Sequence, residues 1–456
     1  MSKRGRSYKL ALVLVGALLL VMLIAPSAFA TTCQTRVQAI GEEVCPYVSS
    51  QVPDDVSVPL IGGGSFQSTF ANPLAALHLT GVTRGFSIEV ADSTYGPFVN
   101  KIAGYGDPET FTNWWLIAVN GFMPPVGAGS VAAQDGDEYL WINAPSTAPQ
   151  SDMALVVNGP TTIPLGQSAT FTIVGDDLGL VNSQADIARF GLDPATTVVQ
   201  TPDQFASIAD ATVHVDGATQ TSDDAGQITV TGAAPGTRSI WAEKAFDDTF
   251  FYVPSTQATT FTVPFSDAAP DSPYFAAIHK IAGTGIVEGY PISPTQIEYR
   301  SQNNLYRAQF AKMITIALEL DVHEGSTSPF ADLGAQVSDN LYPHDYVAAA
   351  HKASIIKGLT ATTFGPWQDV TRAQVATMVV RALQSMHPGV LAQPSADYTG
   401  TWGDFSTVHE ENARLAEFNG LLDGLSLTTT AADPWGPMSR GETAQILDNM
   451  LTLLGE

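Results

Sequence analysis

The sequence predicts a multidomain protein with a small α+β module, an all-β sandwich and an all-α body of three repeats. Its 456 residues exceed what one hydrophobic core usually serves, so several domains are expected. Short alternating apolar runs bounded by turn residues fill the chain up to residue 264, and such runs are typical of strands. Beyond residue 265 the apolar residues recur at helical spacing, and the pattern is repeated three times.

The charge balance excludes one class of partner. The chain has 45 acidic and 20 basic residues, which gives a net charge of −25. Nucleic-acid binding is driven by cations that release counterions from phosphates, and a chain this acidic gains little from that release. We therefore expect no nucleic-acid partner, and an anionic lipid surface also fits the charge poorly.

Residues 1–30 have the pattern of a secretory signal peptide. A basic start precedes an unbroken apolar run at 10–25, and Ala28-Phe29-Ala30 places small residues at the cleavage point. The alternative is an uncleaved signal anchor, but the apolar run is slightly short for a membrane span. We expect cleavage after Ala30, secretion, and no membrane span in the mature chain.

The next segment, 31–56, contains the only two cysteines of the sequence, Cys33 and Cys45. Because an exported protein enters an oxidising compartment, we predict that they form a disulfide. This bond would close a short loop and add about 3 kcal/mol of stability at most. A redox or metal pair is disfavoured, because the C-x-x-C spacing and a nearby histidine are both missing.

A mixed pattern over 57–145 predicts the α+β module. The expected elements are a helix within 70–79, strands at 86–90, 115–119 and 138–142, and a hairpin turn at Asn120-Gly121. Three tryptophans, Trp114, Trp115 and Trp141, form a candidate patch for a ring-shaped ligand or a glycan. The alternative is that alternate tryptophans fill the core.

The region 150–264 alternates apolar and polar residues, for example at 169–174 and 211–215. This spacing predicts a sandwich of immunoglobulin-like type, which we expect to act as a spacer. Paired acids such as Asp176-Asp177 are expected in solvated turns, where they would hold calcium only weakly.

Three repeats follow, at 265–323, 330–387 and 402–456. Each opens with an aromatic residue two positions before an aspartate, continues to a glycine-containing loop, and then reaches an arginine that starts an apolar helical stripe. The aspartates are Asp267, Asp332 and Asp404, the loop glycines are Gly289, Gly358 and Gly424, and the arginines are Arg307, Arg372 and Arg440.

The arginines are predicted to start helices. Thr371 and Ser439 are placed as helix N-caps, and Gln374 and Glu442 complete capping boxes. Each arginine would then lie beside unpaired backbone N–H groups at the positive end of a helix dipole, which suits a carboxylate ligand. The alternative is that each arginine pairs with an acid or caps a neighbouring helix. We expect the three aspartates to be helix caps or fold determinants.

The repeats resemble the S-layer homology family over about 190 residues. This resemblance implies a pseudo-threefold body that binds a pyruvylated secondary cell-wall polysaccharide, in a surface layer associated with peptidoglycan. By position, the three arginines and the three loop glycines would be the polymer-binding residues. Tyr306 replaces an N-cap, Gln309 and Gln374 replace glutamate, and Gly441 replaces alanine, so the number of binding grooves stays open.

The residues at 95–102, 114–121, 126–128 and 135–137 resemble the transcobalamin C-terminal-like domain. The resemblance implies a β-grasp-like fold and makes cobalamin a candidate ligand, although the companion helical barrel of that family is missing. The middle region, including 237–244, resembles bacterial immunoglobulin-like repeats.

Motifs for catalysis are missing: the sequence has neither H-E-x-x-H nor G-x-S-x-G, and its histidines form no metal pair. We expect a non-enzymatic protein without metal or cofactor, secreted to the bacterial cell wall and anchored there by its C-terminal repeats. Its N-terminal module would be displayed for a ligand or partner. The alternative function is surface capture of a corrinoid or another small ligand by that module.

Overall fold

The structure is a computed structural model. It describes residues 30–455 except 41, 95, 111, 148–151, 335, 337–338 and 426–432, so nearly all of the predicted signal peptide lies outside the described residues. The chain divides into two compact units: residues 1–159, 171–228 and 239–259 belong to the first, and 160–170, 229–238 and 260–456 belong to the second. Within the described part, no helix is long and apolar enough to cross a membrane.

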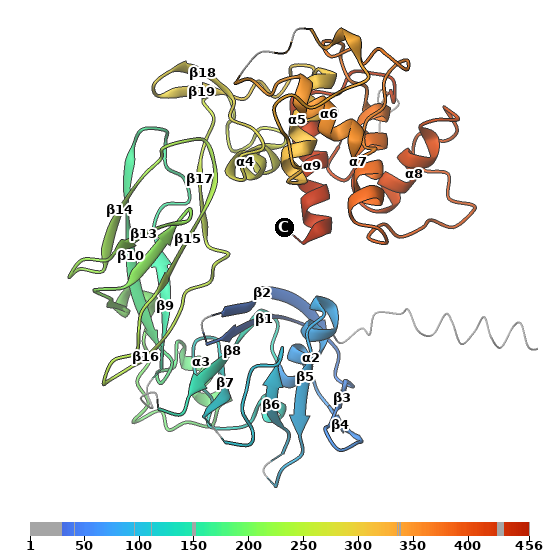
Figure 1. The fold of residues 1–456 in the computed structure, drawn as a ribbon. Coiled ribbons are helices and arrows are strands. Elements are labelled where there is room, and N and C mark those ends of the chain that lie inside the picture. The colour runs from blue at the N-terminus through green and yellow to red at the C-terminus, as the bar shows by residue number, and fades with distance from the viewer. Residues whose placement is uncertain are drawn as a thin grey trace, which may run out of the picture. The chain divides into compact units, whose positions relative to one another are not determined.

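The N-terminal module is built on one four-stranded sheet with the strand order β2-β1-β8-β7 (Figure 1). Its strands are β1 (Thr31–Ala39), β2 (Glu42–Val52), β7 (Asn113–Val119) and β8 (Asp137–Pro145). Strand β1 runs antiparallel to β2 and parallel to β8. The segment 31–56 therefore belongs to the same sheet as the strands of 57–145.

Helix α2 (Pro73–Arg84) packs on β1 and β2, and it overlaps the helix predicted at 70–79 but ends five residues later. It begins at Pro73 because the Asn72 side chain accepts a hydrogen bond from the Ala75 N–H, and it ends at the left-handed Gly85. Two small hairpins complete the module: β3 (Ser57–Pro59) with β4 (Ser65–Gln67), and β5 (Ile88–Ala91) with β6 (Phe98–Ile102).

The predicted disulfide is not formed, because both cysteines are buried free thiols. In the β1–β2 ladder Cys33 lies opposite Ser50, whereas Cys45 lies opposite Val37. At a rise of about 3.3 Å per residue, the backbones of the two cysteines are roughly 13 Å apart along the strands, which is too far for a disulfide. The sequence spacing did not reveal this, because it does not contain the register of the hairpin.

Residues 152–263 are rich in strands, as predicted. One five-stranded sheet has the order β11-β10-β9-β16, with β14 also paired to β10, and a four-stranded sheet has the order β13-β12-β15-β17. The strands are β9 (Asp152–Asn158), β10 (Ser168–Asp177), β11 (Ala206–Ser207), β12 (Thr212–Val215), β13 (Ala218–Thr221), β14 (Gln227–Thr231), β15 (Gly236–Glu243), β16 (Phe251–Val253) and β17 (Thr260–Val263). A short helix, α3 (Gln184–Arg189), interrupts them.

Asp176 and Asp177 end strand β10 and do not lie in a solvated turn, and Asp176 is buried. Burial and the neighbouring charge of Asp177 raise the pKa of Asp176 to about 7, although a hydrogen bond from Asn182 works the other way. The expectation of a solvated acid pair was therefore wrong for Asp176.

In the part that the structure describes, the C-terminal region has two α-helices per repeat. The first repeat has α4 (Phe275–Gly283) and α5 (Arg307–Ala317), the second α6 (His344–Lys352) and α7 (Arg372–Met386), and the third α8 (Glu410–Phe418) and α9 (Arg440–Leu454). A hairpin, β18 (Tyr290–Ser293) with β19 (Gln296–Glu298), interrupts the first repeat, so this region is not purely helical. One hydrophobic cluster extends from Phe265 to Leu451 and includes residues of all three repeats.

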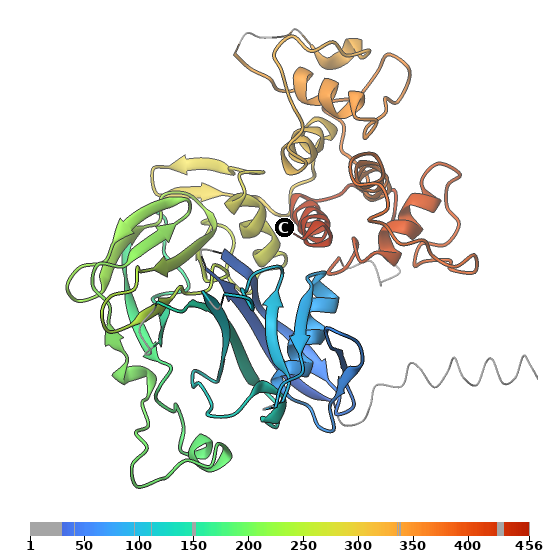
Figure 2. The same cartoon turned by 60° about the horizontal axis from the view of Figure 1, so that its bottom comes forward.

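Each second helix packs against the first helix of the next repeat: α5 on α6, α7 on α8, and α9 on α4 (Figures 1 and 2). The residues before the second helices close a ring of three backbone hydrogen bonds. The Val370 N–H donates to the Leu305 carbonyl (2.9 Å), Met438 donates to Val370 (2.8 Å), and Leu305 donates to Met438 (3.0 Å). All three side chains are buried, so the ring lies inside the region.

Candidate functional site

The three arginines occupy the first position of α5, α7 and α9, as predicted. The Thr371 hydroxyl accepts a hydrogen bond from the Gln374 N–H (3.3 Å), and the Ser439 hydroxyl accepts one from the Glu442 N–H (3.2 Å). The N–H groups of Thr371 and Ser439 donate in turn to the side chains of Gln374 and Glu442, so both capping boxes are complete.

The backbone N–H groups at these helix starts are already bonded. The N–H groups of Arg307 and Ala308 donate to carbonyls of the second repeat, at Gln368 and Pro366 (both 3.0 Å). The starts of α7 and α9 donate in the same way to the third and first repeats. The expected unpaired N–H groups are therefore not available to a ligand carboxylate, because the repeats bond them to one another.

The arginine side chains also reach into the next repeat. Arg307 donates through Nε to the Phe364 carbonyl (2.8 Å) and through Nη2 to the Lys357 carbonyl (3.1 Å). Arg440 donates through Nε to the Tyr299 carbonyl (2.9 Å). Both arginines are more than nine-tenths buried.

Arg372 differs from the other two arginines, because its Nε donates to a carboxylate oxygen of Glu442 (2.7 Å). Here the alternative interpretation, an arginine paired with an acid, describes the structure. Burial lowers the pKa of Arg307 to about 10, so this guanidinium keeps its charge at neutral pH.

The aspartates hold the loops that receive the arginines. Asp332 accepts hydrogen bonds from the N–H groups of Phe364 (2.8 Å) and Gly365 (2.7 Å). Asp267 accepts in the same way from Tyr299 and Arg300 (both 2.7 Å). These two aspartates fix loops and do not cap helices. Asp404 is exposed, and it accepts a bond from Arg414 (3.4 Å).

The loop glycines are required by close packing. A Cβ on Gly358 would lie 2.4 Å from a ring carbon of Phe330, and one on Gly289 would lie 2.5 Å from a ring carbon of Phe265. Gly289 also has φ near +77°, as does Gly424. In the first two repeats, glycine therefore lets the loop lie against the aromatic residue that opens the repeat.

Two grooves lie beside these loops. Groove 1 is lined by residues 285–290, Gln309, Lys312, Met313, Tyr342 and Arg440. Groove 2 is lined by Arg307, 357–359, Gln374, Thr377, Met378, Arg381, Val408 and His409. Each groove combines a glycine loop and second helix of one repeat with the arginine of another.

Groove 2 is strongly cationic. Arg307, Lys357 and Arg381 line it, and none of its described lining residues is acidic. Burial, together with the charges of Arg381 and Arg307, lowers the pKa of His409, so this histidine is neutral at pH 7. Groove 1 has Arg440 and Lys312 but also Glu288, which offsets part of their charge.

Among the described residues at the corresponding place in the third repeat, the arginine is paired with an acid and an amide side chain bonds the glycine loop. Arg372 pairs with Glu442, and the Asn449 amide donates to the carbonyls of Leu421 (3.0 Å) and Asp423 (2.8 Å). The Gln445 side chain would contact a Cβ on Gly424. Arg440 lines groove 1 and Arg307 lines groove 2, whereas Arg372 lines neither of these two grooves.

Sequence reasoning did not identify Lys312 and Arg381. The signal was available for Arg381, since it follows Gln374, Thr377 and Met378 at the spacing of one helix face. Lys312 is placed on α5 in the same way, three residues after Gln309.

The tryptophan patch expected in the N-terminal module is not formed. Trp115 and Trp141 are buried in the core, and only Trp114 is exposed. Adjacent residues of a strand point to opposite faces, so Trp114 and Trp115 cannot form one surface. The alternative interpretation, in which alternate tryptophans fill the core, describes this module.

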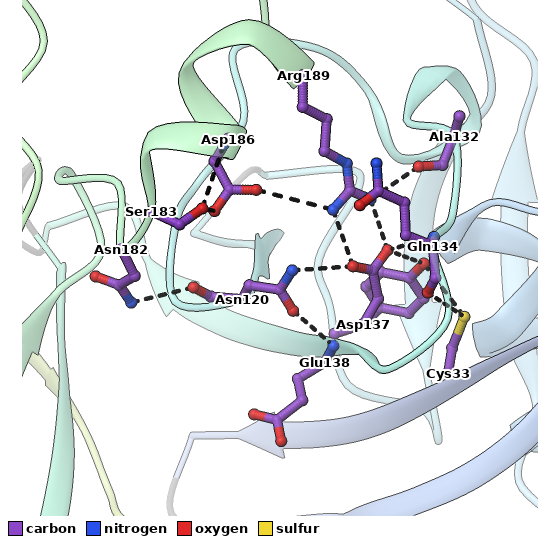
Figure 3. Close-up of polar contacts among 11 residues, drawn as sticks. Cys33, Asn120, Ala132, Gln134, Asp137, Glu138, Asn182, Ser183, Asp186 and Arg189 are labelled. Atoms are coloured by element: carbon purple, nitrogen blue, oxygen red, sulfur yellow. Dashed lines mark hydrogen bonds and ion pairs between the residues drawn. The ribbon is translucent and has the colours of Figure 1, made fainter. Parts of the chain in front are cut away.

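A buried polar cluster surrounds Asp137 in the same unit (Figure 3). Its carboxylate accepts two hydrogen bonds from Arg189 (2.6 and 2.8 Å) and one each from Asn120 Nδ2 (2.9 Å), the Gln134 N–H (2.8 Å) and the Tyr139 hydroxyl (3.0 Å). Burial opposes ionisation, but these donors hold the pKa of Asp137 below its usual range. With its oxygens fully bonded, Asp137 is a structural residue. In the described part of the chain, no three acidic, histidine or cysteine residues are grouped to hold a metal ion.

Comparisons with known proteins match these regions. The S-layer homology domain matches residues 264–297 and 339–376, and a domain of unknown function (DUF4430) matches residues 83–143. The chain is 30% identical over 190 residues to an S-layer protein of Bacillus licheniformis, covering 41% of this chain and 19% of that relative. It is also 30% identical over 146 residues to an uncharacterized cell wall amidase of Bacillus anthracis, covering 31% of this chain and 24% of that relative.

The chain therefore spans about a quarter or less of the length of these relatives. Among solved structures, haptocorrin in complex with Cbi is 16% identical over 25% of each chain, with a TM-score of 0.19. The two S-layer homology matches lie in the C-terminal region, within the first two arginine repeats and at their edge. The chain thus contains S-layer homology domains in its C-terminal region and is a protein of the bacterial cell-wall surface.

Proposed function

We propose that the C-terminal region anchors the protein non-covalently to the cell wall by binding a pyruvylated secondary cell-wall polysaccharide in grooves 1 and 2. The observation that carries this proposal is the charge of groove 2, where three cations gather without an acid in a chain of net charge −25. An acidic protein repels an anionic polymer as a whole, so a local cationic groove is needed to bind it.

The cations of groove 2 have different tasks. Arg307 uses its guanidinium to bond the second repeat, and it contributes charge from a fixed place. The side chain of Arg381 makes no hydrogen bond to any described residue, and Arg381 is only partly exposed. A partly desolvated guanidinium is suited to a carboxylate, which it bonds through two parallel N–H donors. Arg381 is therefore the residue proposed to contact the ketal carboxylate of the polymer.

The rest of the chain would be held at the wall by this anchor. The proposed role is binding, and no catalytic residue is assigned. The display of a ligand by the N-terminal module stays a prediction. The tryptophan patch that was expected to bind this ligand is absent from the described surface.

The proposal is tested by co-sedimentation of the purified protein with isolated wall sacculi, either intact or stripped of wall polysaccharide with hydrofluoric acid. We expect sedimentation with intact sacculi only. Arg381→Ala is expected to weaken the apparent affinity about tenfold or more, since a charge-assisted pair is lost. The matched control is Lys352→Ala, an exposed cation at the end of α6 that lines neither groove.

Two results would contradict this function. Equal sedimentation with stripped sacculi would mean that the polysaccharide is not the ligand. An equal loss for Arg381→Ala and Lys352→Ala would mean that the attraction follows overall charge and does not depend on groove 2.

A further inference from the structure

Two exposed tryptophans occupy the same place in the second and third repeats. Trp367 follows Pro366 and is 56% exposed, and Trp435 follows Pro434 and is 47% exposed. Each stands the same number of residues before the arginine of its repeat. Large aromatic side chains gain free energy when they leave water, so two equivalent exposed indoles are candidates for contact with a ligand.

Each tryptophan borders one of the two cationic grooves. The Trp367 ring lies edge-on to Tyr342, which lines groove 1, at 5.9 Å between centroids. The Trp435 ring lies edge-on to His409, which lines groove 2, at 5.7 Å. A second aromatic contact supports each ring, Tyr306 for Trp367 (6.4 Å) and Phe405 for Trp435 (5.6 Å).

The backbone holds both tryptophans in place. The carbonyl of Pro366 accepts a hydrogen bond from the Ala308 N–H, and that of Pro434 accepts one from the Ala373 N–H. Each tryptophan is thus attached to the start of a helix in the preceding repeat. A side chain fixed before binding loses little conformational freedom when a ligand arrives.

We propose that Trp367 and Trp435 are stacking platforms for sugar rings of the polymer held in grooves 1 and 2. The ligand class is a glycan in which a pyranose ring lies next to a residue bearing an anionic group. The C–H face of the pyranose covers the indole while the anion meets the cations of the groove. This inference rests on the proposed function and adds recognition of the sugar to recognition of the charge.

The place in the third repeat that corresponds to grooves 1 and 2 can be compared with them. The first repeat has Gln302 at the position equivalent to Trp367 and Trp435. The arginine at the corresponding place in the third repeat is Arg372, which forms an ion pair with Glu442. Grooves 1 and 2 therefore each have a tryptophan at the edge and an arginine that forms no ion pair with a described residue, whereas the third place has Gln302 and the Arg372–Glu442 pair. Such joint presence and absence is expected if both serve one ligand.

The test uses the whole purified protein and its Trp367→Ala, Trp435→Ala and double variants. Polysaccharide released from the same sacculi with hydrofluoric acid is the soluble probe, and pyruvate alone is the simple-anion probe. Each single variant is expected to bind intact sacculi up to about tenfold more weakly, and the double variant more weakly still. Trp114→Ala is the matched control, since Trp114 is an exposed tryptophan of the N-terminal module.

Tryptophan emission gives a second readout that does not depend on large truncations. The parent is expected to show a blue shift with the polysaccharide, and Trp367→Phe and Trp435→Phe are expected to lose their shares of that shift while keeping most of the affinity. Unchanged affinity and emission in the variants would overturn the platforms but leave anchoring intact. Pyruvate binding as tightly as the polysaccharide would also overturn the platforms. Failure of the parent to bind intact sacculi would overturn both proposals.

Discussion

At the scale of single residues, Asp332 shows how one carboxylate shapes a groove. By accepting from the N–H groups of Phe364 and Gly365, it fixes the loop whose Phe364 carbonyl receives Arg307. Asp267 fixes the Tyr299 carbonyl for Arg440 in the same manner. In both cases an acid of one repeat positions an arginine that comes from another repeat.

Replacing this carboxylate is expected to destabilise the C-terminal region. Asp332→Asn removes the charged acceptor of two backbone N–H groups and should lower the free energy of unfolding by about 1–3 kcal/mol. Urea unfolding followed by circular dichroism measures the loss. Asp271→Asn, at an exposed position ahead of α4, is the matched control and should change stability little. Equal losses in the two variants would show that the Asp332 hydrogen bonds contribute nothing specific.

The contribution of Asp332 should depend on pH in a defined direction. Burial works to raise the pKa of Asp332, but the hydrogen bonds from Phe364 and Gly365 and the charge of Arg307 outweigh it, so the pKa is lowered. A carboxyl whose pKa falls on folding stabilises the protein when the pH is above its unfolded pKa, and loses this effect on acidification. The stability difference between the parent and Asp332→Asn should therefore shrink as the pH falls below about 4. A difference that grows at low pH would contradict this assignment.

The sequence could place these residues but not their partners. The arginines and aspartates recur at nearly constant spacing, so their positions could be read directly. The contacts of Arg307 with Phe364 and Lys357 join segments about fifty residues apart in the chain, and no local pattern reports such contacts. For the same reason the N–H groups of the helix starts were expected to be free.

At the scale of elements, local rules succeed best. The capping boxes of α7 and α9 follow from residues three positions apart, and the structure has both of them. The turn at Asn120-Gly121, with φ of 51° and 75°, also follows from the dipeptide. The hairpin of β18 and β19 and the register of Cys33 and Cys45 depend on pairing between strands, and the sequence did not predict either.

The cap of α7 provides a test at this scale. Thr371→Ala removes the hydroxyl that accepts from the Gln374 N–H and should lower the free energy of unfolding by about 1 kcal/mol. Thr362→Ala, at an exposed position in the preceding loop, is the control. Thr371→Ser keeps the acceptor and should retain most of the stability, whereas equal losses for the alanine and serine variants would speak against a cap. Thermal unfolding of the four proteins decides between these results.

At the scale of the whole molecule, a buried ion pair joins two segments that are far apart in the sequence. Arg189 of α3 binds Asp137 of β8, and both side chains are at least nine-tenths buried. This pair links the strand that ends the N-terminal module to a helix some fifty residues later. The sequence did not predict the pair, because the two residues are 52 positions apart and no local pattern reports such a contact.

A double-mutant cycle measures this link. Asp137→Ala should cost about 3–5 kcal/mol, because it leaves the Arg189 guanidinium buried without its partner. Adding Arg189→Ala should cost less than the sum of the two single changes. Glu89→Ala, which breaks the exposed Lys101 pair, is the control and should change stability by less than about 1 kcal/mol. The free energies of unfolding of the two single variants, the double variant and the control are measured by following tryptophan emission. Strict additivity of the two single losses would show that Asp137 and Arg189 do not interact.

The ring formed by Leu305, Val370 and Met438 joins the three repeats in a closed cycle. Each of the three segments gives its N–H to one neighbour and its carbonyl to the other, so none of them is terminal. A single proteolytic cut that releases the last repeat would leave one donor and one acceptor bare in a former interior, at a cost of about 1–3 kcal/mol each. The two remaining repeats would keep only the bond between Val370 and Leu305. If the repeats anchor the protein as proposed, one cleavage ahead of the third repeat would therefore weaken its hold on the wall.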